Sequence, residues 1–217
     1  MRTILFIQVL LASLWSAAAA VPKVVLIGDS IRLSYTSKVI QELKGEAEVI
    51  SPKPNGQDSA NVLRNLERWV ISEKPDVVHF NCGIHDTKRF HKDGHFQVSP
   101  GKYESNLRRI VEQIRGKTDA TVLFATTTPI VNDRAAAARK ERDYALTNEA
   151  VEQYNKIALK VMKELDVPVN DLNASLREGG RDLGELIVKD GVHMTPEAQQ
   201  MLGLQVAGFI RTHLPAR

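Results

Sequence analysis

Two short segments near opposite ends of the chain contain the residue types of a nucleophilic active site. Ser30 follows Gly28 and Asp29, and Asp190 stands three positions before His193. A serine hydroxyl becomes a useful nucleophile when a base takes its proton, and a histidine imidazole has a suitable pKa for that task. An aspartate beside the imidazole can fix its tautomer and stabilise its charged form. We therefore predict Ser30 as nucleophile, His193 as base and Asp190 as orienting acid.

Other polar residues follow short apolar runs elsewhere in the chain. They lie at Asn55–Gly56, Asn81–Asp86 and Thr127–Pro129. If the apolar runs are parallel strands of an open α/β sheet, their carboxyl ends meet at one edge, where sites form. The sequence therefore predicts a single crevice that brings these segments together with Ser30 and His193.

These segments resemble, in the same order, the sequence blocks of the SGNH hydrolases, also called the GDSL esterase/lipase superfamily. Gly-Asp-Ser at 28–30 matches the first block, Gly56 the second, Gly-Ile-His-Asp at 83–86 the third, and Asp190 with His193 the last. The matches span nearly the whole chain after its first residues. The resemblance implies hydrolysis of acyl esters through an acyl-serine intermediate, without a cofactor.

The resemblance also implies which groups hold the oxyanion of the tetrahedral intermediate. They are the backbone N–H groups of Ser30 and Gly56 and the side chain of a third-block asparagine, where this sequence has His85. An imidazole can also donate a hydrogen bond, so we hypothesise that His85 replaces the amide. Asn81 is a second candidate. Purely structural roles for His85 and Asn81 stay open at this point.

Three charged residues near these blocks are weaker candidates for contact with a substrate. They are Asp29 in the first block, and Lys88 and Arg89 after the third. The basic pair could hold an anionic group, but a solvated charge pair is the alternative. His91 and His95 are four positions apart, yet a glycine lies between them and no carboxylate pattern accompanies them. We therefore expect no metal site.

The hydrophobic pattern indicates how these segments are positioned. Short runs rich in valine and isoleucine are typical of buried strands, and they span residues 23–27, 47–50, 77–81, 121–126 and 167–171. Longer stretches with helical apolar spacing alternate with them, over residues 59–71, 103–114, 148–165 and 196–210. This alternation predicts a flavodoxin-like, three-layer α/β/α fold with about five parallel strands. Residues 89–100 and 132–145 are less regular, and we predict loops or lids there.

Composition narrows the function classes. The 217 residues are 43% hydrophobic and 25% charged, which fits one globular domain with a full core. The net charge of +3 comes without a dense basic block, so nucleic acid is not an expected partner. The single cysteine, Cys82, excludes an internal disulfide.

Residues 1–20 have the pattern of a signal peptide, with an early arginine, an apolar stretch and a run of small residues before Val21. The hydrolase domain is then expected over 21–217, in a secreted or periplasmic protein. The apolar stretch is short for a membrane span, so no stable membrane association is expected. A retained anchor is the alternative.

The resemblance also implies a substrate class. Exported single-domain members of the superfamily often remove acetyl groups from carbohydrates, and no long apolar segment here suggests a fatty-acyl tunnel. A small acyl ester, such as an acetylated carbohydrate, is therefore the expected substrate. A lysophospholipase, a thioesterase or a non-catalytic carbohydrate-binding module on the same fold are the alternatives. The sugar, the acyl length and the oligomeric state are left open.

Overall fold

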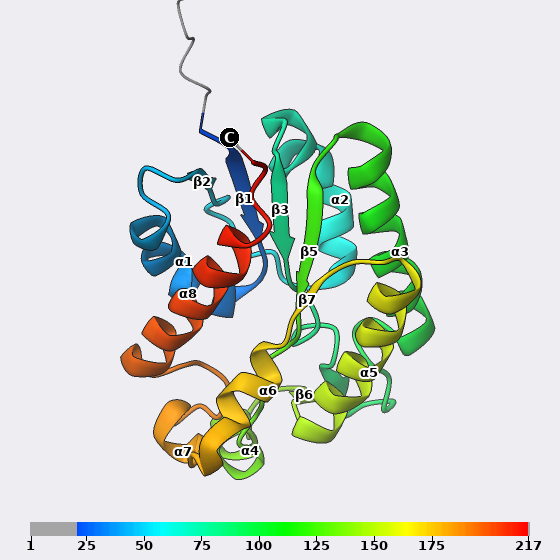
Figure 1. Cartoon of the computed structure of the whole chain (residues 1–217). Coiled ribbons are helices and arrows are strands. Elements are labelled where there is room, and N and C mark those ends of the chain that lie inside the picture. The colour runs from blue at the N-terminus through cyan, green and yellow to red at the C-terminus, as the bar shows by residue number, and fades with distance from the viewer. Residues whose placement is uncertain (1–20, 217) are drawn as a thin grey trace, which may run out of the picture.

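The computed structural model of the protein describes residues 21–216 and has a parallel sheet as its middle layer (Figure 1). The strands are β1 (Lys23–Ile27), β2 (Glu48–Ile50), β3 (Val77–Phe80), β5 (Thr121–Ala125) and β7 (Val169–Asn170). They lie in the order β2-β1-β3-β5-β7 and all pair in parallel. This is the flavodoxin-like order, so the predicted fold class is confirmed.

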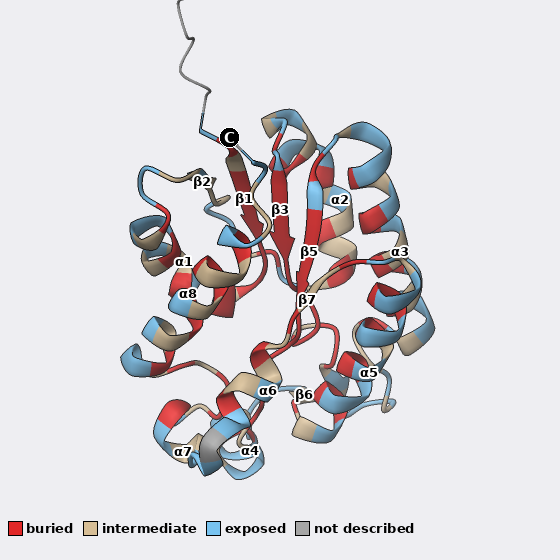
Figure 2. Cartoon of the chain, viewed as in Figure 1, coloured by how far each residue is buried: buried red, intermediate tan, exposed pale blue. Residues whose placement is uncertain are grey.

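Both faces of the sheet are covered, which explains why its strands are continuous apolar runs. In β1, Val25 and Ile27 belong to one hydrophobic core, whereas Val24 and Leu26 belong to the core on the opposite face. Figure 2 shows β1, β3 and β5 as buried along almost their whole length. Successive side chains of a strand point to opposite faces, so one short run contributes to both cores.

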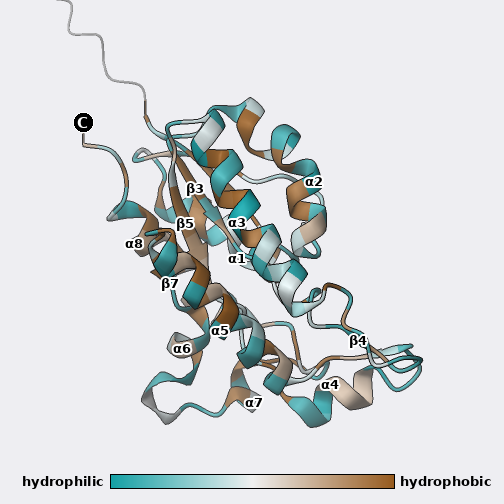
Figure 3. Cartoon of the chain, turned by 90° about the vertical axis from the view of Figure 1, so that its right-hand side faces the viewer, coloured by the Kyte–Doolittle hydropathy of each residue, from teal (hydrophilic) through white to brown (hydrophobic). Residues whose placement is uncertain are grey.

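Two layers of helices enclose this sheet. On one face α1 (Ser30–Glu42) packs beside α8 (Pro196–Arg211), and on the other lie α2 (Ser59–Trp69), α3 (Pro100–Lys117) and α5 (Asn148–Glu164). Hydrophobic and hydrophilic bands alternate along α3 and α5 (Figure 3), as expected when one side of a helix packs on a sheet. A short 3₁₀ turn, η1 (Ile71–Glu73), follows α2.

Smaller elements gather at the carboxyl edge of the sheet, below the strand arrowheads in Figure 1. They are α4 (Asn132–Ala138), α6 (Leu172–Arg177), the 3₁₀ turn η2 (Glu178–Gly180), α7 (Leu183–Leu186), and the strands β4 (Arg89–Phe90) and β6 (Tyr144–Ala145). The stretches predicted as loops therefore contain a helix and an antiparallel ladder, in which β4 pairs with β6. Strands of two residues are too short to show a hydrophobic period, so the sequence pattern did not indicate them.

Within residues 21–216 no helix is long and apolar enough to cross a membrane. The predicted signal peptide, residues 1–20, lies outside the described residues.

Candidate active site

Ser30 is the first residue of α1, directly after the turn that leaves β1. Asp29 caps this helix, because its Oδ1 accepts a hydrogen bond from the Ile31 N–H at 2.9 Å. Asp29 is completely buried, and this burial raises the pKa of its carboxyl even though the Ile31 N–H acts to lower it. Among residues 21–216 the N–H of Ser30 has no hydrogen-bond partner. A free N–H at the positive end of a helix is suited to hold an anion.

His193 and Asp190 lie beside Ser30, although 163 positions separate His193 from the serine. His193 Nε2 is 2.9 Å from Ser30 Oγ, and its Nδ1 is 2.5 Å from Asp190 Oδ2. The structure therefore brings the three predicted catalytic residues into one hydrogen-bonded chain. Each contact falls within the reach required for proton transfer or for orientation of the imidazole.

The turn from Asp190 to His193 is built around the aspartate. Asp190 Oδ1 accepts hydrogen bonds from the backbone N–H groups of Val192 at 2.8 Å and His193 at 2.9 Å. Partial burial acts to raise the pKa of Asp190, but its hydrogen bonds with His193 and Val192 outweigh this and lower it. The carboxyl is therefore ionised when the imidazole needs a partner.

The turn from Asp190 to His193 is also fixed by contacts with α4 and with a small hydrophobic cluster. Gly191 has a φ of +74°, and a Cβ there would lie 2.3 Å from the backbone nitrogen of Ala135 in α4. Only glycine fits both the left-handed conformation and the close approach. Arg139 adds a hydrogen bond of 2.8 Å from Nη1 to the Asp190 carbonyl, and Val192 belongs to a small hydrophobic cluster with Ile130 and other residues of this edge.

A pocket of about 250 Å³ opens in front of Ser30 and His193. Its other lining residues are Asn55, Ile84, His85, Lys88, Arg139, Tyr144, Leu146 and Val192. The pocket combines an apolar wall with basic and amide groups, and it is small. It is therefore suited to a short acyl group attached to a polar alcohol.

His85 lines this pocket, as the sequence hypothesis requires. Burial lowers the pKa of His85 to about 4, and the nearby Lys88 charge adds to the effect. The imidazole is therefore neutral at ordinary pH and carries a single N–H, which it can donate. The next residue, Asp86, is buried and accepts hydrogen bonds from both the backbone N–H and the hydroxyl of Ser59 at the start of α2.

The other two predicted donors are placed differently. The Gly56 N–H donates to the Gly28 carbonyl at 2.9 Å, and a Cβ on Gly56 would lie 2.6 Å from that oxygen. Glycine at position 56 thus permits two backbone segments to touch, but its N–H is already engaged. Asn81 is 3% exposed, lies against Gly28 and is not part of the pocket lining.

Of the three weaker candidates for substrate contact, one lines the pocket and two do not. Lys88 lines the pocket, with its Nζ 5.0 Å above the Tyr144 ring. Asp29 is completely buried and is not part of the pocket lining. Arg89 lines a separate hollow and donates from Nε to the Gly94 carbonyl at 3.0 Å.

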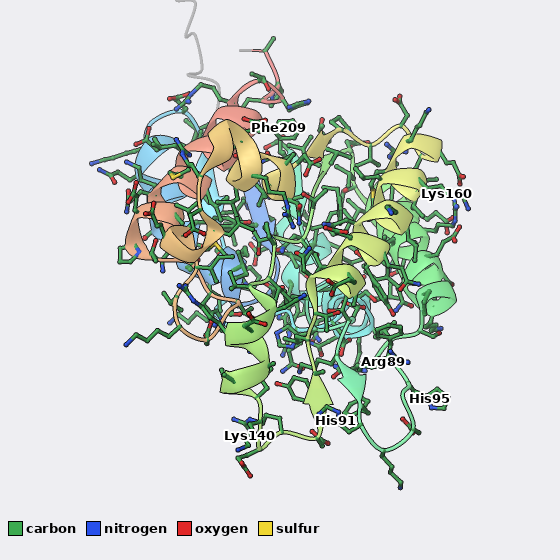
Figure 4. The ribbon with its side chains drawn as sticks, turned by 90° about the horizontal axis from the view of Figure 1, so that it is seen from below. Arg89, His91, His95, Lys140, Lys160 and Phe209 are labelled. Carbon is green, nitrogen blue, oxygen red and sulfur yellow. The ribbon has the colours of Figure 1, made fainter. Side chains whose placement is uncertain are left out.

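Figure 4, which looks onto this edge, shows Arg89, His91 and His95 around β4 and the loop that follows it. His95 contacts Asp93 at 3.3 Å and is largely exposed. In the described part of the chain, no three residues of the metal-binding types are grouped as a metal site.

Six lining residues were not among the predicted site residues: Asn55, Ile84, Arg139, Tyr144, Leu146 and Val192. Asn55 precedes Gly56, so its position after a predicted strand was a usable signal. Arg139 and Tyr144 fall in a stretch without a clear period. Only the folded edge shows that they reach the pocket.

The profile of the GDSL-like lipase/acylhydrolase family matches residues 26–201, which include every part of the Ser30 pocket. The chain belongs to this family. It is a carboxylic ester hydrolase, and the predicted resemblance to the SGNH/GDSL superfamily is thereby confirmed. No curated protein matches the chain significantly.

Solved structures show the same fold. The lipase/acylhydrolase of Enterococcus faecalis is 22% identical, with a TM-score of 0.71 over 90% of this chain and 98% of its own. The acetylxylan esterase Axe2 of Geobacillus stearothermophilus is 20% identical, with a TM-score of 0.70 over 90% and 97%. The acetyl xylan esterase AlAXEase is 19% identical, with a TM-score of 0.67 over 87% and 99%.

Three variants of Axe2 are described as catalytic mutants. They replace a serine, an aspartate and a histidine, and the last two stand three positions apart. Asp190 and His193 of the present GDSL-family chain have the same spacing.

Proposed function

We propose that this hydrolase removes acetyl or similarly small acyl groups from carbohydrate, with Ser30, His193 and Asp190 as its catalytic triad. The hydrogen-bonded chain from Asp190 through His193 to Ser30 carries the proposal. The catalytic serine, aspartate and histidine of Axe2 support it as well. The reaction has two steps, acylation of the serine and hydrolysis of the acyl-serine.

In the first step, His193 Nε2 takes the hydroxyl proton while Ser30 Oγ attacks the carbonyl carbon. Asp190 holds the Nδ1–H and stabilises the imidazolium. When the tetrahedral intermediate collapses, the bond to the alcohol oxygen breaks and His193 returns the proton to that oxygen. Water then repeats the sequence on the acyl-serine, releasing the carboxylic acid and restoring the Ser30 hydroxyl.

The oxyanion needs donors that are in position before the reaction. The Ser30 N–H at the start of α1 is one, and we assign the neutral His85 imidazole as another. Gly56 could add its N–H only by leaving the Gly28 carbonyl. Lys88, whose ammonium group lies over the Tyr144 ring at the pocket wall, is assigned to contact the alcohol part of the substrate.

Two observations support the substrate class. The pocket of about 250 Å³ has room for a short acyl group, whereas clefts that bind drug-sized ligands are roughly 300–1,000 Å³. Two of the similar structures are acetylxylan esterases. Export of the protein, directed by residues 1–20 as a signal peptide, is part of the proposal because their sequence has that pattern.

The test compares p-nitrophenyl acetate with the octanoate, using the purified protein and the Ser30→Ala variant. We expect acetate to be hydrolysed faster than octanoate, and the variant to lose roughly 10⁴-fold or more in kcat. A fluorophosphonate probe should label the wild-type protein and leave Ser30→Ala unlabelled. Retained hydrolysis in the variant would contradict the triad, and a preference for octanoate would contradict the substrate class. Acetylated xylo-oligosaccharides would then test the carbohydrate part.

A further inference from the structure

Asn55 lies on the wall of the Ser30 pocket, and none of the steps above uses it. Its side-chain amide has a fixed orientation, because Oδ1 accepts a hydrogen bond from the Gln57 N–H at 2.8 Å. The donor of that bond is a backbone N–H, so the atom facing it must be the oxygen. Within the described residues, the Nδ2 group has no hydrogen-bond partner. It is therefore a free N–H₂ donor beside the nucleophile.

The residue after Asn55, Gly56, is held by two hydrogen bonds. The Gly56 N–H donates to the Gly28 carbonyl at 2.9 Å, and Asn61 Nδ2 donates to the Gly56 carbonyl at 3.0 Å. Gln57 has a φ of +55°, a left-handed conformation that is uncommon outside glycine. Such a conformation persists only where its surroundings impose it. The Gln57 N–H that orients the Asn55 amide is thus part of a constrained turn.

A buried arginine fastens this loop to the serine turn. Arg32, in the first turns of α1, is 1% exposed. Its Nη2 donates to the Gly28 carbonyl at 3.0 Å and to the Pro54 carbonyl at 3.1 Å. Its Nη1 donates to the Pro52 carbonyl at 2.9 Å and to Ser51 Oγ at 2.6 Å. One guanidinium therefore joins the turn before Ser30 to the segment that leads into Asn55.

These contacts also explain why a further donor is needed. The family pattern calls for a glycine N–H and an asparagine amide, but here the Gly56 N–H is bonded to Gly28 and position 85 is a histidine. Among the residues that line the pocket, Asn55 is the one side chain with a primary amide. The Lys88 ammonium group, by contrast, lies 5.0 Å from the centre of the Tyr144 ring.

We propose that Asn55 Nδ2 donates a hydrogen bond to the oxyanion of the tetrahedral intermediate, as a catalytic residue beside the Ser30 N–H and His85. Arg32 is the positioning residue that holds the Asn55 loop against the Ser30 turn. This proposal rests on the proposed function, since it concerns the transition state of the same ester hydrolysis.

The first test measures p-nitrophenyl acetate hydrolysis by Asn55→Ala and Asn55→Asp. Loss of one oxyanion donor lowers kcat by about 10²–10³, and the loss should leave KM close to the wild-type value. Aspartate keeps the Oδ1 acceptor for Gln57 but replaces the donor with a negative charge, so its loss should be the larger. Lys53→Ala, an exposed position of the same loop, is the matched control and should keep full activity.

A second readout separates a donor from a residue that only shapes the loop. The phosphonyl oxygen of a fluorophosphonate occupies the oxyanion position, so its labelling rate should fall by about the same factor as kcat. The melting temperatures of both Asn55 variants should stay near that of Lys53→Ala. Rates within about threefold of wild type would overturn the proposal. So would a rate loss accompanied by a raised KM and a lowered melting temperature.

Arg32→Lys and Ser51→Ala test the positioning role. If Arg32 acts through Asn55, Arg32→Lys should lower kcat, and combining it with Asn55→Ala should add little further loss. Ser51→Ala removes one contact of the guanidinium and keeps the measurement possible if Arg32→Lys does not fold. Fully additive losses would overturn the link between the two residues.

The two proposals fail in distinguishable ways. An active wild type with unaffected Asn55 variants refutes the donor role and leaves the esterase intact. Activity that survives in Ser30→Ala, or a wild type that neither hydrolyses these esters nor reacts with the probe, refutes the proposed function itself.

Discussion

The two ends of the hydrogen-bonded chain from Ser30 through His193 to Asp190 are held by different means. Ser30 directly precedes two buried residues of α1, Ile31 and Arg32, which are 2% and 1% exposed. The turn of Asp190 and His193 is more open, because these side chains are 35% and 44% exposed. Its fixed shape comes from hydrogen bonds of the Asp190 carboxylate and from contact with α4.

Ser30 and His193 are therefore positioned by different parts of the fold. Ser30 takes its position from β1 of the sheet and from α1, whose first residue it is. His193 takes its position from a turn in which Asp190 accepts a hydrogen bond from the backbone N–H of His193 and also contacts its imidazole. Substitution of the buried residues that follow Ser30 in α1 should therefore lower the free energy of unfolding, whereas substitutions in the turn should mainly lower activity.

The largest effect is expected for Asp190→Asn. The amide oxygen can still accept the Val192 and His193 N–H groups, so the turn should survive. Its NH₂ group would face Nδ1 and favour the wrong imidazole tautomer, which lowers kcat by about 10⁴-fold in a triad of this type. Esterase rates checked beside the melting temperature would decide this. A variant that loses stability in proportion to activity would show that the carboxylate mainly maintains the turn.

Gly191→Ala tests the shape of the turn rather than its chemistry. The new Cβ would meet the Ala135 nitrogen at 2.3 Å, so the turn must move. A displacement near 1 Å can cost about 10²-fold in rate. Gly45→Ala is the control, because Gly45 also has a positive φ of +82° but open space at the Cβ position. Equal activity losses in both variants would contradict the role assigned to the contact with α4.

The contrast between regular elements and contacts among distant segments also explains what could be predicted from the sequence. The strand pattern correctly predicted that the polar segments after the strands lie at the carboxyl edge of the sheet, because buried parallel strands have a strong local signal. Ser30, Asp190 and His193 were predicted from residue types and their chemistry, and the structure places the three side chains in hydrogen-bond contact. For Lys23–Ile27 the predicted strand and the observed strand coincide.

The remainder depends on contacts between distant segments. A buried arginine such as Arg32 is unusual, and nothing in its local sequence indicates that it binds four groups around residues 28 and 51–54. The engagement of the Gly56 N–H depends on how closely two turns approach. The ladder of β4 and β6 places Lys88 and Tyr144 at the pocket, and strands of two residues carry no periodic signal.

A pair of arginine substitutions sharpens the comparison in terms of stability. Arg32→Met would remove the charged donor of the hydrogen bonds to Gly28, Ser51, Pro52 and Pro54, so the free energy of unfolding should fall by about 3 kcal/mol or more. Arg139→Ala removes hydrogen bonds to the Ala135 and Asp190 carbonyls at the half-buried turn, and should cost about 0.5–1.5 kcal/mol. Urea unfolding of both variants measures the difference. Similar losses would mean that the two ends are equally tied to the core.

The smallest effect concerns the pH dependence of the free energy of unfolding. The carboxyls of Asp86 and Asp190 should contribute to it with opposite signs. Burial raises the pKa of Asp86 from 3.8 to about 7, despite its hydrogen bonds with Ser59, whereas the hydrogen bonds of Asp190 lower the pKa of that carboxyl below 3.8. A carboxyl with a raised pKa binds its proton more tightly in the folded state. Its contribution is therefore complete below pH 4 and is lost as the pH rises toward 7.

The contribution of Asp190 has the opposite dependence, since it is present above about pH 4 and is lost as the pH falls further. Asp86→Asn should therefore flatten the decline in unfolding free energy between about pH 4 and 7, and Asp190→Asn should leave that decline unchanged. Urea unfolding at a series of pH values checks both variants. An unaltered slope in Asp86→Asn would mean that Asp86 remains ionised in the folded protein, with its charge fully compensated by Ser59 and the start of α2.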